Sequence, residues 1–466
     1  MEYKISNRLR LAAIIMVVLG LLGVGYGFMD AHSVTEDNIS EILAAEHDAH
    51  GGGHATEGHG SAGHGNDHAK TSHDNSHGES ASHAEEGHGE SAHGSLTEHE
   101  EHALHQIHNR PYAALYVAAF FFFMIALGVL AFYAIQYAAQ AGWSPVLFRV
   151  MEGITSYVLP GGIIVLLIAF FADSHLFVWL KDGVTDVNSE NYDYLVAGKS
   201  SWLNKTGFFI RGAIFLGGWA LYRHFSRKFS IAQDSADDNR NFKKNFRISA
   251  AFLVFYIYTE SMMSWDWIMS VDPHWFSTLF GWYVFASMFV SGITVIAMIT
   301  IYLKSKGLLE FVNDSHIHDL AKFMFGISIF WTYLWFSQFM LIWYSNIPEE
   351  VTYFVTRIEH YKLPFFGMLA MNFIFPLLVL MNSDYKRIPW FVVMAGIIIL
   401  CGHYLDVFNM IMPATVVERW SIGIPEIGSI LLFGGLFLFI VFTALGKAPL
   451  LAKGNPFMKE SKHFHY

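Results

Sequence analysis

The feature that most constrains this chain is a series of long apolar runs, each about the length of a helix that crosses a bilayer. Such a helix needs roughly 20 mostly apolar residues, because lipid offers no hydrogen-bond partner to an exposed backbone amide. We expect ten transmembrane helices from these runs. They cover residues 11–28, 112–137, 146–171, 207–225, 248–269, 279–303, 320–344, 364–382, 389–411 and 425–446.

Composition and charge agree with this prediction. Of the 466 residues, 53% are apolar and 15% are charged, whereas soluble domains carry about 25% charged residues. If the N-terminus lies in the cytoplasm, most of the 29 Lys and Arg residues fall on the cytoplasmic side, as the positive-inside rule requires. The sequence therefore predicts an all-α integral membrane protein with both termini in the cytoplasm.

The first apolar run has two interpretations. Lys4, Arg8 and Arg10 precede it, and Gly25 and Gly27 could form a small-residue cleavage site, so the run could be a signal peptide that is removed. We favour a retained anchor over residues 1–30. The other nine helices keep the same orientation in either case.

Residues 31–110 form a low-complexity stretch of Gly, Ser, Ala, Glu and His, with 15 histidines between positions 47 and 108. It has too few apolar residues for a core, so we expect a disordered periplasmic segment. His99, His102, His105 and His108 recur every three residues and are weak metal-ligand candidates if the second helix extends outward. The favoured alternative is a solvated tail that titrates near neutral pH, and no firm metal site is predicted.

The single cysteine, Cys401, lies within the ninth apolar run. One thiol excludes a disulfide framework, a cysteine-held iron–sulfur cluster and a CxxCH haem attachment within this chain. His403 is the only histidine well inside a predicted span, which argues against a bis-histidine haem. We therefore expect a polytopic membrane domain over residues 111–446 that carries no redox centre, followed by a cytoplasmic tail over residues 447–466.

Charged residues inside the fifth run are candidates for function, because a charge within the bilayer is costly. Glu260 falls near mid-depth, Ser264 follows one helical turn later, and Asp266 lies nearer the outer surface. Together with Tyr258 they suggest a proton-exchanging carboxylate with hydroxyl neighbours. The alternative is a buried carboxyl that is protonated or satisfied by a neighbouring helix, for which Arg211 of the fourth run is a candidate partner.

The ninth run carries a second candidate, because His403 and Asp406 are three residues apart and share one helix face. A carboxylate beside an imidazole raises the proton affinity of the ring and fixes its tautomer. This pair suits a proton relay or hydrogen bonding to a quinone carbonyl. The alternative is a structural pair that joins two helices.

Four other polar residues in the spans receive structural interpretations. Gln338, Asn372 and Asn409 are uncharged and are expected to hold helices together. Glu152, near the cytoplasmic end of the third run, is interpreted as an interfacial charge.

Two predicted outer loops are rich in aromatic and acidic residues. Residues 264–276 read SWDWIMSVDPHWF, and residues 342–350 read IWYSNIPEE. Tryptophan and tyrosine gather at membrane interfaces, so an aromatic belt explains the rings. The belt does not explain Asp272, His274, Glu349 and Glu350, which could line a proton exit or dock another subunit.

The same two loops carry a family resemblance. The runs WDWIMSVDPHWFSTLFGWYVFASMF (265–289) and WYSNIPEEVTYFVTR (343–357) resemble the F subunits of alternative complex III, a bacterial quinol:cytochrome c oxidoreductase. Those subunits belong to the wider polysulfide-reductase membrane-subunit (NrfD-like) family. The likeness covers most of the chain but not the His-rich insert.

The resemblance implies two four-helix bundles plus extra helices, in the bacterial inner membrane. It implies a homologous C subunit, an iron–sulfur subunit and multihaem cytochrome c subunits as partners, with a terminal oxidase as a further candidate. Haem c and iron–sulfur clusters would lie in those partners, and menaquinone or lipid is all that this chain would bind. No nucleic acid partner is expected.

These expectations give a leading hypothesis and two alternatives. The leading one is a cofactor-free, proton-conducting subunit of a respiratory (mena)quinol:cytochrome c oxidoreductase, part of an oxidoreductase complex without holding its redox centres. The second is that the chain binds quinol itself through His403 and Asp406. The third is a secondary transporter, which would need broken helices at matching positions of two inverted halves; Pro160, Gly161 and Gly162 have no clear counterpart.

Overall fold

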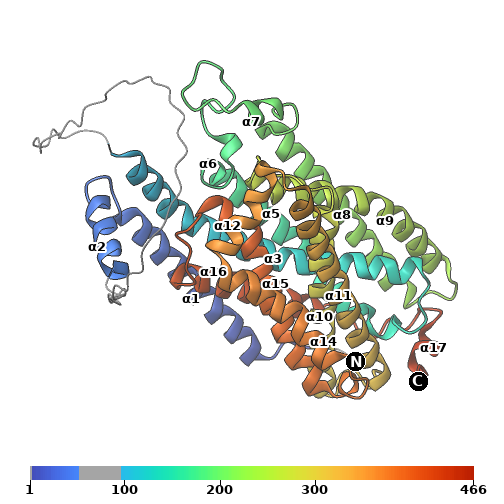
Figure 1. Cartoon of the computed structure of the whole chain (residues 1–466). Helices are drawn as coiled ribbons and strands as arrows, with labels where there is room; N and C mark the ends of the chain where they lie inside the picture. Colours follow the sequence, from blue (N-terminus) through green and yellow to red (C-terminus); the bar gives the residue numbers. More distant parts are fainter. Residues whose placement is uncertain (1–2, 52–95, 466) are drawn as a thin grey trace, which may run out of the picture. The chain divides into compact units, whose positions relative to one another are not determined.

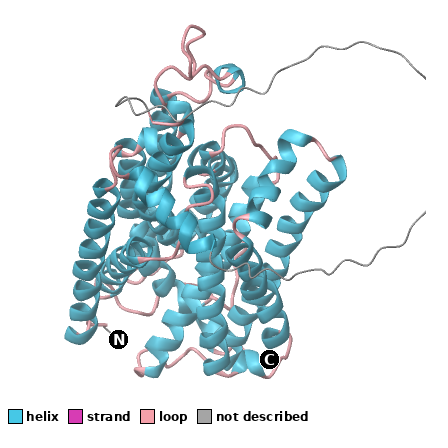
Figure 2. Cartoon of the chain, turned by 60° about the vertical axis from the view of Figure 1, so that its left-hand side comes forward, coloured by secondary structure: helices cyan, strands magenta, loops and turns pink. Residues whose placement is uncertain are grey.

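The computed structural model describes residues 3–51 and 96–465, and every regular element in these ranges is helical (Figures 1 and 2). The predicted all-α class is therefore confirmed. The chain divides into two compact units. One comprises Met1–Ser33 and Gln106–Tyr466, here called the main unit, and the other comprises Val34–His105.

Eight helices of the described residues are long and apolar enough to cross a membrane, which supports a multi-pass membrane protein. Two of them are built from shorter helical pieces, two others contain an internal proline, and η5 is a π-helical turn within one of the composite helices. The eight are α1 (Asn7–Ser33), α3 (Glu98–Ala138), Pro145–Phe171 with α4 (Phe148–Ile154) and α5 (Val158–Phe171), α10 (Phe280–Ser305), α11 (Asp314–Ser345), Lys362–Leu380 with α13 (Lys362–Leu369), η5 (Ala370–Ile374) and α14 (Phe375–Leu380), α15 (Pro389–Thr415) and α16 (Ile424–Leu445).

The other two expected spans, 207–225 and 248–269, are the long helices α8 (Lys205–Gln233) and α9 (Arg240–Trp267), which are not among the eight. Their polar side chains bond across the α8–α9 contact. Tyr222 lies 2.8 Å from Ser249, Ser226 donates to Asn245 at 2.6 Å, and the Trp219 indole donates to Thr259 at 3.0 Å. The polar side chains on the facing sides of α8 and α9 therefore have their hydrogen-bond partners within this pair of helices. The expected number of ten transmembrane helices stays a prediction.

Helix α1 packs along α16 with almost no space between the two backbones. A methyl group added at Gly20 would lie 2.3 Å from the Leu432 nitrogen, and one at Gly23 would lie 2.9 Å from the Gly428 Cα. Small residues permit such close approach between membrane helices. Retention of α1 stays a prediction.

Helix α10 is the link between the core and the candidate site. It crosses α3 so closely that a methyl group at Gly292 would lie 2.8 Å from the Val129 nitrogen. Its other faces pack against α11 and α15. Nearly all of its length is buried, so polar side chains on α10 meet protein rather than lipid.

Both described ends of the His-rich stretch are helical, which corrects the expectation of disorder across residues 31–110. Helix α2 covers Ile39–Gly51, and α3 begins at Glu98. The start of α3 is capped because Thr97 Oγ1 accepts from the Glu100 amide at 3.3 Å and Glu100 accepts from the Thr97 amide at 2.9 Å. Residues 52–95 lie outside the described part of the chain.

The C-terminal residues 447–465 do not form a free tail but pack onto the main unit. Ser461 donates to the Trp143 carbonyl at 2.6 Å, Asn313 donates to the Phe464 carbonyl at 2.6 Å, and the Gly454 amide donates to Asp234 at 3.2 Å. Short helix α17 (Met458–Lys462) lies within this segment. The C-terminal segment thus contacts three connections between helices, at Trp143, Asp234 and Asn313.

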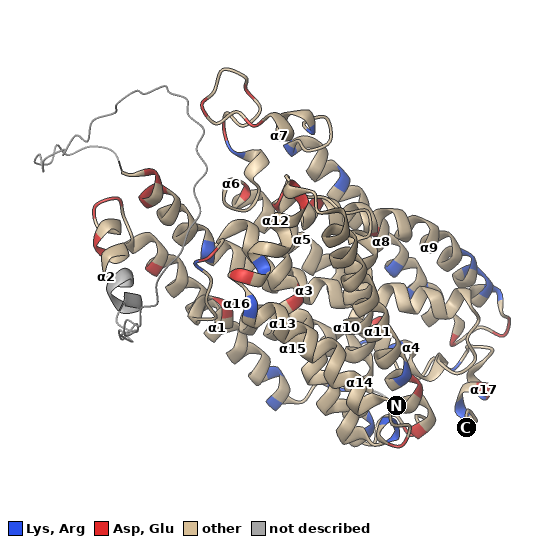
Figure 3. Ribbon diagram, in the orientation of Figure 1, with Lys and Arg blue, Asp and Glu red and all other residues tan. Residues whose placement is uncertain are grey.

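We call the end of the main unit that holds these contacts the terminal end, since both chain termini lie there (Figures 1 and 2). Lys and Arg gather at this end in Figure 3. The far end holds the 172–204 connection, with α6 (Asp173–Leu176) and α7 (Tyr194–Gly198), and α12 (Pro348–Glu359).

Candidate functional site

The structure brings His403 and Asp406 together, as their spacing on α15 predicts. Both side chains are completely buried, and His403 Nδ1 lies 3.4 Å from Asp406 Oδ2. Two other helices supply the remaining partners of the carboxylate. The Tyr283 hydroxyl of α10 donates to Oδ1, and the Trp331 indole of α11 donates to Oδ2 at 2.8 Å.

Asp406 is therefore a buried carboxyl held by neutral donors and one imidazole. Among the ion pairs of the described residues, none joins Asp406 to a lysine or arginine. The described residues therefore offer this buried carboxyl a hydroxyl, an indole and an imidazole, an arrangement through which neighbouring groups could exchange a proton.

The imidazole of His403 has one occupied and one free nitrogen. Nδ1 lies 2.9 Å from the Ser287 hydroxyl and 3.5 Å from Asn372 Nδ2, whereas the buried Nε2 has no hydrogen-bond partner among the described residues. Asn372 sits in the π-helical turn η5, and a methyl group at Gly402 would lie 2.1 Å from its Oδ1. Single π turns occur often at functional sites; here the turn lets Asn372 reach His403.

Next to this pair is a small polar cavity of about 20 Å³. Tyr283, Gln338, Arg357 and Asn409 contribute its polar wall. Tyr283 therefore touches both Asp406 and the cavity. A space of this size holds about one water molecule when polar partners surround it.

Arg357 of α12 is the functional residue that sequence reasoning missed at this site. Only 2% of it is exposed. Its guanidinium donates to the Asn409 carbonyl at 3.0 Å and to the Tyr353 carbonyl at 2.7 Å, while Nη2 and the Asn409 side-chain oxygen have no protein partner. One water in the cavity could accept from the first and donate to the second. The sequence signal that could have indicated Arg357 is its i, i+4 spacing from Tyr353, which places both side chains on one face of a helix.

Glu260 is buried within α9, and its Oε1 has no hydrogen-bond partner. The neighbours predicted for it lie elsewhere: Tyr258 is 65% exposed, and Ser264 donates to the Ser261 carbonyl at 2.7 Å. Tyr258 thus points away from Glu260, and a proton-exchanging role of Glu260 stays a prediction.

Asp266, and not Glu260, is the partner of Arg211. The guanidinium donates to the two carboxylate oxygens of Asp266 at 2.6 and 3.1 Å, and the Trp202 indole donates to Oδ1 at 2.8 Å. The alternative that paired Glu260 with Arg211 is therefore corrected. Asp266 lies about one and a half turns further along α9, where it reaches the start of α8.

At the far end, the polar loop residues have local partners. His274 Nε2 lies 2.5 Å from Asp193 Oδ2, which ties the 268–279 connection to the 172–204 connection. Glu349 and Glu350 occupy the first turn of α12, where the helix dipole favours acidic residues. Asp272, in the connection between α9 and α10, is partly exposed and has no ion pair among the described residues. These positions suit structure as well as a proton exit.

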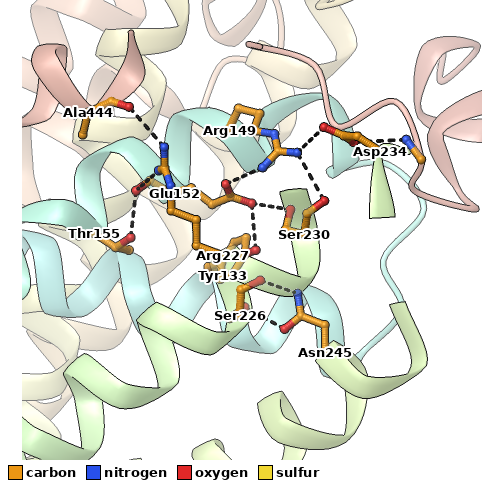
Figure 4. Close-up of polar contacts among 11 residues, drawn as sticks. Tyr133, Arg149, Glu152, Thr155, Ser226, Arg227, Ser230, Asp234, Asn245 and Ala444 are labelled. Atoms are coloured by element: carbon orange, nitrogen blue, oxygen red, sulfur yellow. Dashed lines mark hydrogen bonds and ion pairs between the residues drawn. The ribbon is translucent and has the colours of Figure 1, made fainter. Parts of the chain in front are cut away.

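A second buried network lies at the terminal end and corrects the interfacial interpretation of Glu152 (Figure 4). Glu152 is 2% exposed. It accepts from Tyr133 at 3.0 Å, from Ser230 at 2.6 Å and from Arg149 at 2.7 Å, and Arg149 also donates to Asp234 at 2.5 Å. Helix α8 covers the carboxylate, and this coverage leaves no trace in the local sequence around Glu152.

The histidines at the start of α3 form helical neighbours rather than a metal cluster. His102 lies 3.8 Å from Glu98 and His105 lies 3.9 Å from Glu101. Within residues 3–51 and 96–465, no three side chains of His, Cys, Asp or Glu are placed to hold a metal ion. Residues 52–95 of the His-rich stretch lie outside the described part of the chain.

No family model matches the chain, and no curated protein matches it. Inference about function therefore depends on the geometry of these buried groups and on the resemblance of the two far-end loops.

Proposed function

We propose that this chain is a cofactor-free membrane subunit of a bacterial respiratory (mena)quinol:cytochrome c oxidoreductase complex, and that it conducts protons. The observation that carries the proton role is Asp406, a fully buried carboxyl without a cationic partner that touches a water-sized polar cavity through Tyr283. The resemblance of residues 265–289 and 343–357 to F subunits of alternative complex III supports the assignment to that complex.

The arrangement suits proton movement toward the far end. A proton on Asp406 can pass through the hydroxyl of Tyr283 to a water in the cavity, whose wall includes Arg357. His403 lies on the other side of Asp406 and can accept the replacing proton.

The Glu152 network is the corresponding candidate at the terminal end. Its carboxylate is linked through Arg149 to Asp234, which lies in the connection after α8. A charged pair that leads from a helix connection to a buried carboxylate can take up protons from the adjacent aqueous phase. With both termini in the cytoplasm, as proposed from the charge bias, this would be the cytoplasmic side.

In this proposal electrons bypass the chain. Haem c and iron–sulfur clusters belong to multihaem cytochrome and iron–sulfur partners, and a homologous C subunit lies beside this one in the bacterial inner membrane. Quinol oxidation in a partner would drive protonation changes here.

The test is Asp406→Asn in the purified complex reconstituted into lipid vesicles. We expect proton translocation per electron to fall at least several-fold while quinol oxidation continues, because Asn keeps the hydrogen-bonding shape but cannot exchange a proton. Asp186→Asn, which changes an exposed acid of the 172–204 connection, is the control and should leave both rates unchanged. Equal loss of both activities, or of neither, would contradict a dedicated proton role.

A second candidate function is quinol binding at His403 itself, and the free Nε2 of that ring favours it. This nitrogen could bond to a quinone oxygen. Loss of quinone from the purified complex on His403→Ala, with all subunits still assembled, would support this reading over the first. Unchanged quinone content would exclude it.

A further inference from the structure

A second small cavity lies at the terminal end, next to the Glu152 network that Figure 4 shows. It encloses about 10 Å³ between α3, the end of α8, the start of α9 and the C-terminal segment, residues 447–465. Tyr137, Ser230, Asn245 and Asn455 are among the polar residues that line it. A polar space of about this size holds one water molecule.

Ser230 connects this cavity to a buried carboxyl group. Its hydroxyl donates to Glu152 at 2.6 Å, and the same residue lines the cavity. Tyr283 has the matching position at the far end, where it donates to Asp406 and lines the polar cavity. Each of these two carboxyl groups is therefore bonded to a hydroxyl-bearing residue that also borders a water-sized space.

The C-terminal segment forms one wall of the terminal-end cavity. Ala452 and Asn455 line the cavity and are 2% and 7% exposed. Their neighbours Lys453 and Pro456 are exposed, so a single stretch of chain separates the cavity from solvent. Asn455 Oδ1 accepts from the Phe457 amide at 3.0 Å. The group that Asn455 offers to a water molecule is therefore its Nδ2 donor.

This segment packs against the end of α8 at a glycine. The Gly454 amide donates to Asp234 at 3.2 Å, and Asp234 also accepts from Arg149. A methyl group added at Gly454 would lie 1.9 Å from the Gln233 carbonyl oxygen. That oxygen belongs to the backbone and cannot rotate away. Position 454 thus admits only glycine while the segment stays in place.

We propose that the C-terminal segment is a gate over the Glu152 network, and that Asn455 and Ser230 hold one water molecule beneath it. The gate is closed in this structure, because Ala452 and Asn455 are part of the cavity wall and Ser230 is only 4% exposed. Movement of the segment away from α8 would open the cavity to the aqueous phase. Regulation of proton entry by this movement rests on the proposed function, whereas the water site and the contact at Gly454 do not.

X-ray radiolysis of the full-length protein in isotope-labelled water tests the water site, because radicals formed from a bound water oxidise the side chains beside it. We expect oxidation of Tyr137, although it is only 3% exposed. Tyr116 is the internal reference, since it is also buried and its hydroxyl bonds to the Trp267 carbonyl. Asn455→Leu should lower oxidation of Tyr137 several-fold, and Asn382→Leu, at an exposed position, should leave it unchanged.

A second variant keeps the result interpretable if Asn455→Leu folds poorly. Ser230→Ala removes the other polar partner of the water without adding volume, and it should also lower oxidation of Tyr137 several-fold. An unmodified Tyr137 in the wild type, or equal oxidation in the wild type and both variants, would overturn the water site.

Gly454→Ala tests the gate, because its methyl group has no space against Gln233. We expect oxidation of Tyr137 to rise several-fold as bulk water enters the cavity. Gly326→Ala, at a glycine with nothing within 4 Å of the added methyl group, is the matched control and should match the wild type. Unchanged oxidation in Gly454→Ala would overturn the gate. Proton translocation is not read in this experiment, so its outcome is separate from that of Asp406→Asn.

Discussion

At the scale of single residues, three buried carboxyl groups of this chain differ in what surrounds them. Asp266 is bonded to a guanidinium, and Glu152 is bonded to another, whereas Asp406 meets only neutral donors and one imidazole. Removing either partner of a buried carboxylate–arginine pair would leave an isolated buried charge. The contrast sets Asp406 apart from the two arginine-paired carboxyl groups.

The Asp193–His274 contact gives a pH prediction at this scale. Burial raises the pKa of Asp193, but bonds from the Val196 amide and from His274 outweigh it, and the pKa lies below its ordinary value. A carboxyl with a depressed folded pKa stabilises the fold above its unfolded pKa, and the effect is lost as pH falls through the folded pKa. The 172–204 connection should thus stay attached at neutral pH and loosen only below about pH 4.

Hydrogen exchange of the Leu195 and Val196 amides, which both donate to Asp193, measures this attachment. We expect Asp193→Ala to speed their exchange at pH 7 and to remove the acid dependence. Asp186→Ala, which removes an exposed carboxylate in the same connection, is the matched control. Identical exchange in wild type and Asp193→Ala would refute the assignment.

At the scale of helices, apolar runs predicted the positions of all ten long helical segments, because hydrophobic length is a local property of sequence. The His403–Asp406 contact was predictable for the same reason, since i, i+3 neighbours meet on any helix. Tyr283 and Trp331 were not, because they come from α10 and α11, and contacts between distant segments leave no local pattern. The burial of Glu152 depends on α8, which is distant in the sequence, so the residues around Glu152 did not predict it.

The α1–α16 contact yields a prediction with an internal control. Gly20→Val should lower the free energy of unfolding by at least about 1–3 kcal/mol, because the added side chain has no space against Leu432. Gly25→Val changes helix propensity equally but meets nothing within 4 Å. Thermal unfolding of both variants in detergent measures the difference. Equal melting temperatures would show that α1 does not pack here.

The C-terminal segment gives a prediction about access to the Glu152 network. Gly454 bonds to Asp234, which joins Arg149 and thereby Glu152. Deleting residues 447–466 should expose this network to water. In a Cys401→Ser background, Ser230→Cys should react several-fold faster with a water-soluble maleimide after the deletion.

Ser235→Cys serves as the reference for that measurement, because position 235 is exposed and should react equally in the full-length and shortened chains. Slow reaction of Ser230→Cys in both chains would mean that the C-terminal segment does not shield the network.

At the scale of the whole molecule, the open question is whether α8 and α9 cross the membrane with the eight apolar helices. Asp234 lies just after α8 and bonds to Gly454, so the α8–α9 connection is at the terminal end. The residues before α8 belong to the far end. Two crossings are therefore the arrangement that we expect, and the internal hydrogen bonds of the pair explain how lipid tolerates their polar residues.

Labelling from each side of the membrane checks this arrangement. In a Cys401→Ser background, Ser235→Cys should react with an impermeant maleimide only from the cytoplasmic side, and Ser200→Cys only from the opposite side. Both positions are exposed. Reaction of both cysteines from the same side would leave eight spans.

The glycine contact between α1 and α16 also says something about how the chain is made. Helix α1 docks on the last long helix of the chain, so its proper place does not exist until α16 has entered the membrane. We therefore expect the docking of α1 to follow the insertion of α16 rather than to accompany the insertion of α1 itself.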